Sequence, residues 1–268
     1  MFRKIARPIA LSFATGIVTF EIANQLKKSN PSSSLTLPKI QRQLQRPESF
    51  LKRLIQIPIN EWNSLTSHKK AVYSLIAVNS LVFVAWQIPR FSKLMYTQFM
   101  HHDNHSRYIP MLTSAFSHNN LIHFGANMMV LSSFGPITSQ LIGSPEDFVA
   151  FYVTSGVCSS AISEIITALL KRKVLPGLGA SGALMSCIGV CSISMPFAPV
   201  GIMFLPFSFQ LADLFTGLFV FDCVGVAMGW QIIGHSCHIG GALTGLYFAW
   251  NYLPQRRIQF KQWINKRL

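Results

Sequence analysis

Charged side chains are scarce in this chain of 268 residues, and acidic ones are the scarcest. Only 12% of the residues are charged, and nine of them are Asp or Glu. Soluble proteins carry about 25% charged residues, roughly twice as many. By contrast, 50% of the residues are hydrophobic, and the mean hydropathy is +0.36. This composition argues against a soluble domain and predicts a polytopic membrane protein.

The few charges are mostly basic and give a formal net charge of +14. Fourteen of the 23 Lys and Arg lie at or before Lys93, and five more follow Pro254. Because they flank apolar segments, membrane topology and targeting explain them better than nucleic-acid binding. We therefore expect a lipid bilayer around the protein and no nucleic-acid partner.

The cysteine and histidine patterns favour neither a disulfide nor a metal site. All five cysteines lie in or beside apolar stretches, which favours buried thiols. His101 and His105 have Asp103 between them but lack the glutamate of an HExxH site, so a solvated loop is expected. The two histidines and the cysteine within residues 235–238 have no evident fourth ligand. No metal and no cofactor are predicted.

Apolar segments divide the chain into four parts. Residues 1–28 hold an apolar run long enough to cross a core of about 30 Å, so a membrane span is favoured over a mitochondrial targeting segment, although Glu21 lies near its end. Residues 29–69 are rich in Ser, Pro, Gln and basic residues and predict a linker. Residues 70–253 form the predicted membrane domain, and 254–268 a basic tail. The domain contains six apolar segments, at about 71–89, 120–141, 147–170, 181–196, 207–226 and 236–253.

The fourth apolar segment is too short to cross a membrane. From Ser181 to Met195 it would span about 22 Å as a helix, and Pro196 bounds it. Its start must then lie below one membrane surface, which is tolerable only beside a water-filled cavity.

Ser181 stands at that start, within the run GLGASGALM. Gly179, Ala180 and Gly182 place no bulk around its hydroxyl, and the glycines allow close approach of other groups. Two roles are open for Ser181. It is either the N-cap of the helix, accepting from an amide two or three residues on, or a nucleophile that needs a base.

A base is available in GHSCHIGGALTG, at the start of the last apolar segment. His238, Gly241 and Gly245 share one helix face, and the two glycines form a GxxxG pair that permits close helix contact. The imidazole is then either bonded to a backbone carbonyl or held against the helix that carries Ser181.

Hydrogen-bond donors occur in FSHNNLIHFGANMM, before the second apolar segment. His123 and Asn127 are i,i+4 and project together from the helix, which is the chemistry of an oxyanion hole when combined with the Ser181 amide. His118 lies five residues before His123 and is interpreted as a loop-ordering group.

Taken together, FSHxxxxHxxxN, GxSG and H-x-GG-x-x-x-G on six apolar helices resemble the rhomboid intramembrane serine proteases. TSAFSH, LGASGA, FLP, MGW and the extra leading span resemble the mitochondrial presenilin-associated rhomboid-like subgroup. The resemblance covers about residues 60–253. It implies an all-α membrane protein with a six-helix core and one added N-terminal helix (1+6), located in the mitochondrial inner membrane.

The resemblance also implies a Ser–His dyad without an aspartate. Ser181 would attack the scissile carbonyl, and His238 would act as general base and then general acid. His123 and Asn127 would stabilise the oxyanion, while packing at Gly241 and Gly245 would fix the histidine. The substrates would be single-span membrane proteins.

Two positions depart from the bacterial members of the family. Met185 stands where they place a tyrosine against the catalytic histidine, and Ile109-Pro110 stands where their first loop has a Trp-Arg pair. Both departures fit the mitochondrial subgroup, and they leave open what packs against His238 and how the first loop seats in lipid.

Three acidic residues lie in or beside expected spans, and ionisable groups at membrane depth are usually paired or functional. Glu164 and Asp213 stay unassigned. Three roles are open for Asp222: it forms a hydrogen bond near the loop at 225–235, it is protonated, or it is the third member of a catalytic triad. An inactive rhomboid-like binder of membrane helices and a small-solute transporter using these acids are the competing functions.

Membrane orientation has two solutions. With seven spans, the side holding the linker and C-terminus carries 14 basic residues against nine on the other side. The positive-inside rule puts the heavier side in the matrix or cytosol, whereas the usual arrangement of the subgroup puts it in the intermembrane space.

Overall fold

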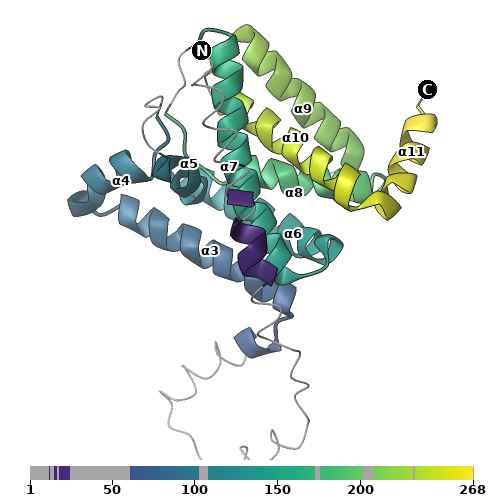
Figure 1. Ribbon diagram of the computed structural model, residues 1–268, viewed down its shortest axis with the longest axis horizontal. Helices are drawn as coiled ribbons and strands as arrows, with labels where there is room; N and C mark the ends of the chain where they lie inside the picture. Colours follow the sequence, from purple (N-terminus) through teal and green to yellow (C-terminus); the bar gives the residue numbers. More distant parts are fainter. Residues whose placement is uncertain are drawn as a thin grey trace, which may run out of the picture.

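The computed structural model describes Ser12 and residues 15–16, 18–24, 61–102, 108–172, 176–201, 208–231 and 233–267. Within them the chain is almost wholly helical, and each of the six predicted apolar segments holds a helix (Figure 1). These six helices are α3 (Ser67–Trp86), α6 (Leu121–Ile142), α7 (Pro145–Leu169), α8 (Ser181–Ser194), α9 (Leu211–Met228) and α10 (His235–Tyr252). The shorter elements are η2 (Pro89–Phe91), α4 (Ser92–Gln98), α5 (Ile109–Thr113), η3 (Ser114–Phe116), η4 (Pro254–Arg256) and α11 (Arg257–Asn265). Strands β1 (Pro199–Gly201) and β2 (Ser208–Gln210) pair antiparallel between α8 and α9.

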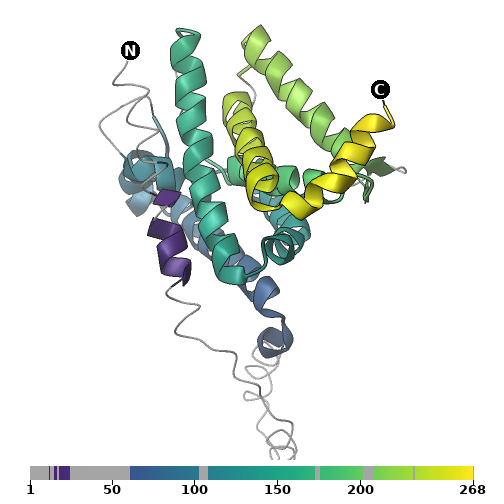
Figure 2. The ribbon, with the colours of Figure 1, turned by 45° about the vertical axis from the view of Figure 1, so that its right-hand side comes forward.

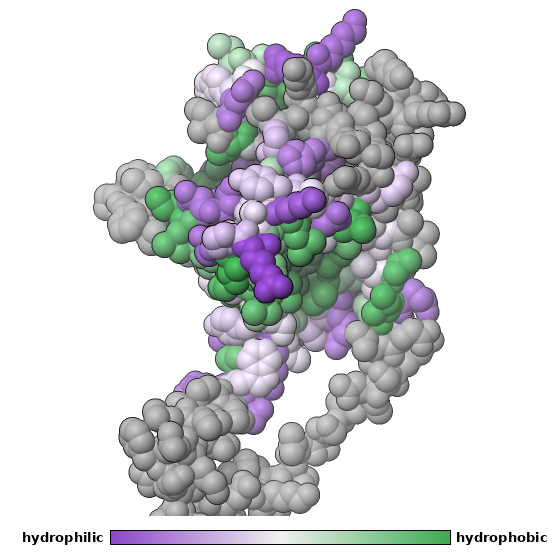
Figure 3. All heavy atoms as spheres, turned by 90° about the vertical axis from the view of Figure 1, so that its left-hand side faces the viewer, coloured by the Kyte–Doolittle hydropathy of each residue, from purple (hydrophilic) through white to green (hydrophobic). Residues whose placement is uncertain are grey.

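Several helices carry an apolar surface that suits lipid. Among the described residues, α3, α7 and α9 are long and apolar enough to cross a membrane, and α8 is a shorter apolar helix. On α3 the side chains of Val78, Leu81 and Val84 are 45%, 72% and 54% exposed. Figure 3 shows apolar side chains beside and between polar ones on this side of the molecule. Such a surface is stable when hydrocarbon rather than water covers it.

Helix α8 lies at the centre of the bundle, between α6, α7 and α10 (Figures 1 and 2). Every residue from Gly182 to Ser194 is buried, which is the pattern of a helix covered on all sides. Its 14 residues span about 21 Å at 1.5 Å per residue. The prediction of a short fourth helix is therefore confirmed.

The largest apolar cluster fills the space between α6, α7 and α8. Leu131, Phe148 and Tyr152 are fully buried in it, together with Cys187 and Val190 of α8. The thiols of Cys187 and Cys191 are buried as predicted, whereas Cys223 is exposed on α9. Cys223 lies on the outer side of the bundle, where an apolar stretch faces outward.

Local capping fixes where the helices around the site begin and end. The Asn120 side chain accepts from the amides of Ile122 and His123 and starts α6, while the Ser144 hydroxyl caps α7. Helix α9 ends at Gly229, whose φ of +74° lies in the left-handed region that favours glycine. The Arg172 guanidinium donates to the last carbonyls of α9, those of Val226 and Ala227.

The first and last helical segments that the structure describes contact the bundle. Residues 18–24 are helical and lie beside α7 (Figure 2), where Thr19 Oγ1 is 2.9 Å from Thr154 Oγ1. Apart from Ser12 and residues 15–16, the rest of residues 1–28 and residues 29–60 of the predicted linker lie outside the described residues. Helix α3 begins at Ser67, a little before the predicted boundary, because the Thr66 hydroxyl caps it. The basic tail contains α11, and Arg267 pairs with Asp213 near the start of α9.

Candidate active site

Ser181 is the first residue of α8, and its hydroxyl does not cap the helix. The N-cap is Ala180, which makes no side-chain cap hydrogen bond. Ser181 Oγ instead lies 2.9 Å from His238 Nε2, across the contact between α8 and α10. The interpretation of Ser181 as an N-cap is therefore wrong, and the hydroxyl is paired with an imidazole.

Two glycines of α10 bring its backbone against that of α8. A Cβ on Gly241 would lie 2.0 Å from the Gly182 carbonyl oxygen, and one on Gly245 would lie 2.2 Å from that of Ser186. Real Cβ atoms do not approach so closely, so only glycine fits at either position. The Ser186 hydroxyl donates to the Gly241 carbonyl oxygen at 2.7 Å and ties the same two helices together. The contact sets the distance between Ser181 and His238.

The first turns of α6 form a second wall of the site. The His123 ring lies against Gly179, where a Cβ would be 2.8 Å from His123 Cε1. Gly179 has a φ of +133°, so its backbone requires glycine as well. Asn127 Nδ2 donates one hydrogen to the His123 carbonyl oxygen at 2.9 Å. Because a carboxamide nitrogen carries two hydrogens, the second remains for another acceptor.

A histidine in the loop before α6 is hydrogen-bonded to Ala180, the residue that precedes Ser181. His118 is fully buried, and its Nε2 accepts from the Ala180 amide at 3.3 Å. Its ring packs edge-on against those of His123 and Phe124. The neighbouring Ser117 hydroxyl accepts from Trp86 Nε1 at 2.6 Å, which anchors the loop to α3. The geometry matches the loop-ordering interpretation of His118.

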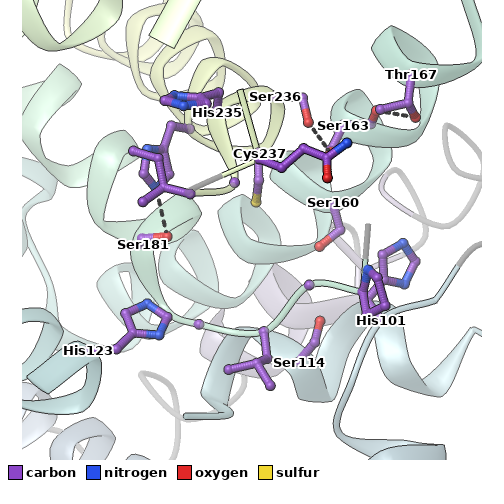
Figure 4. Close-up of a pocket in the computed structure, with 18 of the residues that line it drawn as sticks. His101, Ser114, His123, Ser160, Ser163, Thr167, Ser181, His235, Ser236 and Cys237 are labelled. Carbon is purple, nitrogen blue, oxygen red and sulfur yellow. Dashed lines mark hydrogen bonds between the residues drawn. The ribbon is translucent and has the colours of Figure 1, made fainter. Parts of the chain in front are cut away.

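An open cavity of about 1380 Å³ brings these groups together (Figure 4). Ser181, His238, His123 and Asn127 all line it. In Figure 4 the dashed line from Ser181 marks its bond to the imidazole, and His123 faces the same space from below. The structure thus gathers the four predicted side chains at one hollow that begins at the N-terminal end of α8.

Asp222 requires a correction to the sequence interpretation. Its Oδ1 lies 3.2 Å from His238 Nδ1 and 2.7 Å from His235 Nδ1. The aspartate is 2% exposed, so it is enclosed between α9 and α10. A dyad without an aspartate therefore does not describe the contacts of His238 completely. The only signal in the sequence was an acidic residue inside an apolar segment.

The other two acidic residues are paired away from Ser181. Glu164 Oε1 lies 3.0 Å from His101 Nε2, and both side chains are buried. His101 also exchanges backbone hydrogen bonds of 2.8 Å with Gly177, in the segment that leads to Ser181. Asp213 pairs with Arg267 at the opposite end of α9. The two pairs lie apart from each other, and His101 lines the same cavity as Ser181.

Met185 occupies the position where the bacterial members place a tyrosine. It is buried in an apolar cluster with Phe215 and Ala242. The Nδ1 atom of His238 is hydrogen-bonded to Asp222 on α9.

Comparisons with known proteins match the part of the chain that contains these residues. The family model of the rhomboid domain matches residues 105–255. The chain is 36% identical over 190 residues to the mitochondrial presenilin-associated rhomboid-like protein of Mus musculus, covering 70% of this chain and 50% of the relative. It is 30% identical over 203 residues to the mitochondrial rhomboid protein 1 of Saccharomyces cerevisiae, covering 72% and 58%. It is 26% identical over 216 residues to the mitochondrial RHOMBOID-like protein 12 of Arabidopsis thaliana, covering 74% and 63%.

The chain spans about half the length of the curated mammalian relatives that it matches. The match still includes every motif that surrounds the cavity, from the loop before α6 to the end of α10. The chain therefore belongs to the rhomboid family, in its mitochondrial presenilin-associated subgroup, and is a multi-pass membrane protein of mitochondria.

Proposed function

We propose that this protein is an intramembrane serine endopeptidase. The observation that carries the proposal is the 2.9 Å separation of Ser181 Oγ and His238 Nε2 within an open cavity at the start of a buried helix. A hydroxyl becomes a useful nucleophile when an adjacent base accepts its proton. The pair has this geometry, and general acid–base partners act at such distances.

In the proposed reaction Ser181 Oγ bonds to the scissile carbonyl carbon while its proton passes to His238 Nε2. The carbonyl π-electrons move to its oxygen and form the oxyanion. When the tetrahedral intermediate collapses, the C–N bond breaks and His238 returns the proton to the leaving amine. Water then repeats the two steps on the acyl-enzyme and frees Ser181.

The oxyanion would be stabilised by three donors around Gly179. These are the His123 ring, the second Asn127 Nδ2 hydrogen and the Ser181 backbone amide. The left-handed Gly179 leaves the space in front of them without a side chain. A side-chain donor of this kind contributes about 3–4 kcal/mol to the stability of the transition state.

The proposed substrates are single-span membrane proteins, because the site lies among apolar helices and the cavity of about 1380 Å³ has room for an unwound segment of a substrate chain. The proposal places the protein in the mitochondrial inner membrane, with residues 1–28 as an added span before a six-helix core at 70–253. The contact of Thr19 with Thr154 supports a retained first helix. The chemistry needs no cofactor.

Labelling with a fluorophosphonate probe tests the proposal. The probe phosphonylates an activated serine, so the purified wild-type protein should be labelled, whereas Ser181→Ala and His238→Ala should not. Ser192→Ala is the matched control, since Ser192 lies on the same helix and its hydroxyl bonds locally to the Gly189 carbonyl. Labelling that persists in Ser181→Ala would remove Ser181 as the nucleophile. Labelled protein that cleaves no membrane-anchored substrate would favour a helix-binding function instead.

A further inference from the structure

One buried carboxylate lies between two histidines beside the cavity. Asp222 Oδ1 is 2.7 Å from His235 Nδ1 and 3.2 Å from His238 Nδ1. Asp222 is 2% exposed and His235 is 3% exposed. A carboxylate enclosed in this way is costly unless its hydrogen-bonding partners are in place. The two imidazoles, three residues apart on one face of α10, are those partners.

Helix α9 is shaped to accept the His235 ring. Gly225 lies three residues after Asp222 on α9, and a Cβ there would be 2.6 Å from atoms of that ring. The ring centroids of Phe221 and Trp230 lie 5.4 and 6.0 Å from that of His235 and 5.6 Å from each other. The His235 ring therefore packs against Phe221, Trp230 and Gly225. It forms the shorter of the two hydrogen bonds to the Asp222 carboxylate.

Hydrogen-bond chemistry then fixes the proton of His238. An ionised carboxylate only accepts hydrogen bonds, so the Nδ1 atom of each histidine must carry the hydrogen. A neutral His238 with its hydrogen on Nδ1 has a lone pair on Nε2. That lone pair faces the Ser181 hydroxyl, as a general base requires.

We propose that Asp222 is a positioning residue of the reaction, which holds His238 in the tautomer that accepts the Ser181 proton, and that His235 and Gly225 keep Asp222 in place. This inference rests on the proposed serine protease function. When Ser181 transfers its proton, His238 becomes an imidazolium with hydrogens on both nitrogens. Asp222 keeps its negative charge throughout and receives no proton.

Asp222→Asn separates this role from simple space filling. Asparagine has the same shape, but its amide can donate to His238 Nδ1 and so impose the other tautomer, whose Nε2 cannot accept from Ser181. On a fluorogenic peptide that the wild type cleaves, Asp222→Asn should lower kcat at least 100-fold and change KM less than twofold. If Asp222 only fills space, Asn should keep the activity and Asp222→Ala should lose it.

Two further readouts keep the proposal open to refutation. In ¹⁵N-histidine NMR, His238 should carry its hydrogen on Nδ1 in the wild type and on Nε2 in Asp222→Asn. Gly225→Ala should displace His235 and lower kcat about tenfold. Gly217→Ala, on the same helix with no atom within 4 Å of the added Cβ, should match the wild type.

The outcomes distinguish the two levels of the argument. Asp222→Asn with kcat within threefold of wild type overturns the positioning role, and the protease function then stands as long as Ser181→Ala is inactive. If Asp222→Asn does not fold, equal kcat values for Gly225→Ala and Gly217→Ala overturn it. Labelling of Ser181→Ala at the wild-type level overturns the protease function itself.

Discussion

Helix α10 contacts two of its neighbours, α8 and α9, in opposite ways. Against α8 it presents Gly241 and Gly245, and backbone meets backbone with no room for a side chain. Against α9, which lies on its outer side in Figures 1 and 2, the contact beside the site depends on Asp222 and its two histidines. Helix α8 is buried almost throughout, whereas α9 has only five buried residues.

The difference shows how one helix can meet two separate requirements. The distance from nucleophile to base must be constant to a fraction of an ångström, and backbone contact provides that because glycines have no rotamers. The protonation of the base depends on hydrogen bonds, which side chains supply. Substitutions on the two sides of α10 should therefore fail in different ways.

The largest effect is expected on the α8 side, from Gly241→Ala. The added Cβ would meet the Gly182 carbonyl oxygen at 2.0 Å, and neither backbone can yield without moving the dyad. We expect a loss of about 3 kcal/mol in stability from overpacking and about a 100-fold or greater loss in kcat/KM from misplacement. Peptide cleavage and thermal unfolding in detergent measure these. Gly125→Ala on α6, with open space around it, is the control that should change neither.

Asn127→Ala tests the wall that α6 adds to the site. Removing one oxyanion donor should lower kcat about 100-fold, while KM stays near the wild-type value because the ground state does not use the bond. Steady-state kinetics on the same peptide measure both constants. A rise in KM with unchanged kcat would mean that Asn127 binds the substrate rather than the oxyanion.

The response to acid tests the anchor behind Ser181. Burial, followed by the neighbouring His123, lowers the pKa of His118 to about 3, from an ordinary value of about 6.5. Between these values the unfolded chain binds a proton that the folded chain does not, so stability falls as pH drops below about 6.5. Between pH 7 and pH 5 the loss should be about 2 kcal/mol.

His118→Gln provides the matched variant for that experiment. The Gln carbonyl can accept from the Ala180 amide, and it does not titrate. The variant should lose less stability than the wild type between pH 7 and pH 5 in thermal unfolding. Equal losses in the two proteins would show that His118 does not carry the acid sensitivity.

The smallest effect is expected on the α9 side, from Arg172→Gln. Arg172 donates to the carbonyls at the end of α9, where a cation is favourable. Because the side chain is exposed, its loss should lower stability by about 1 kcal/mol or less and leave cleavage within about threefold of the wild type. Lys171→Gln, at the adjacent exposed position, should have no measurable effect in the same unfolding assay.

The sequence was most informative for the site residues that lie in short local motifs. Ser181 is marked by its glycines, His238 by its spacing to Gly241 and Gly245, and His123 with Asn127 by one helical turn. The short length of α8 predicted a buried start beside a cavity, since an apolar helix that cannot span must end below a surface. Helix geometry groups these residues, whereas their catalytic roles were inferred from the resemblance to rhomboid proteases.

Asp222 illustrates what such local patterns leave out. It lies 16 residues before His238 and on another helix, so their contact depends on how α9 is rotated against α10. That rotation is set by the packing of His235 between Gly225, Phe221 and Trp230, which no periodicity encodes. A tertiary contact likewise explains why Ser181 does not cap its helix, because its hydroxyl is hydrogen-bonded to His238 on the neighbouring helix.

Because α8 is short, chemical labelling of Ser181 can report the orientation of the protein in the membrane. With 14 residues the helix is too short to cross a membrane, so under the proposed insertion in the membrane the Ser181 hydroxyl would face one aqueous compartment only. A permanently charged fluorophosphonate that cannot permeate lipid will reach it from that compartment and not from the other. Applied to mitochondria whose outer membrane has been removed, and to inverted inner-membrane vesicles, such a reagent would reveal which way the polypeptide is inserted.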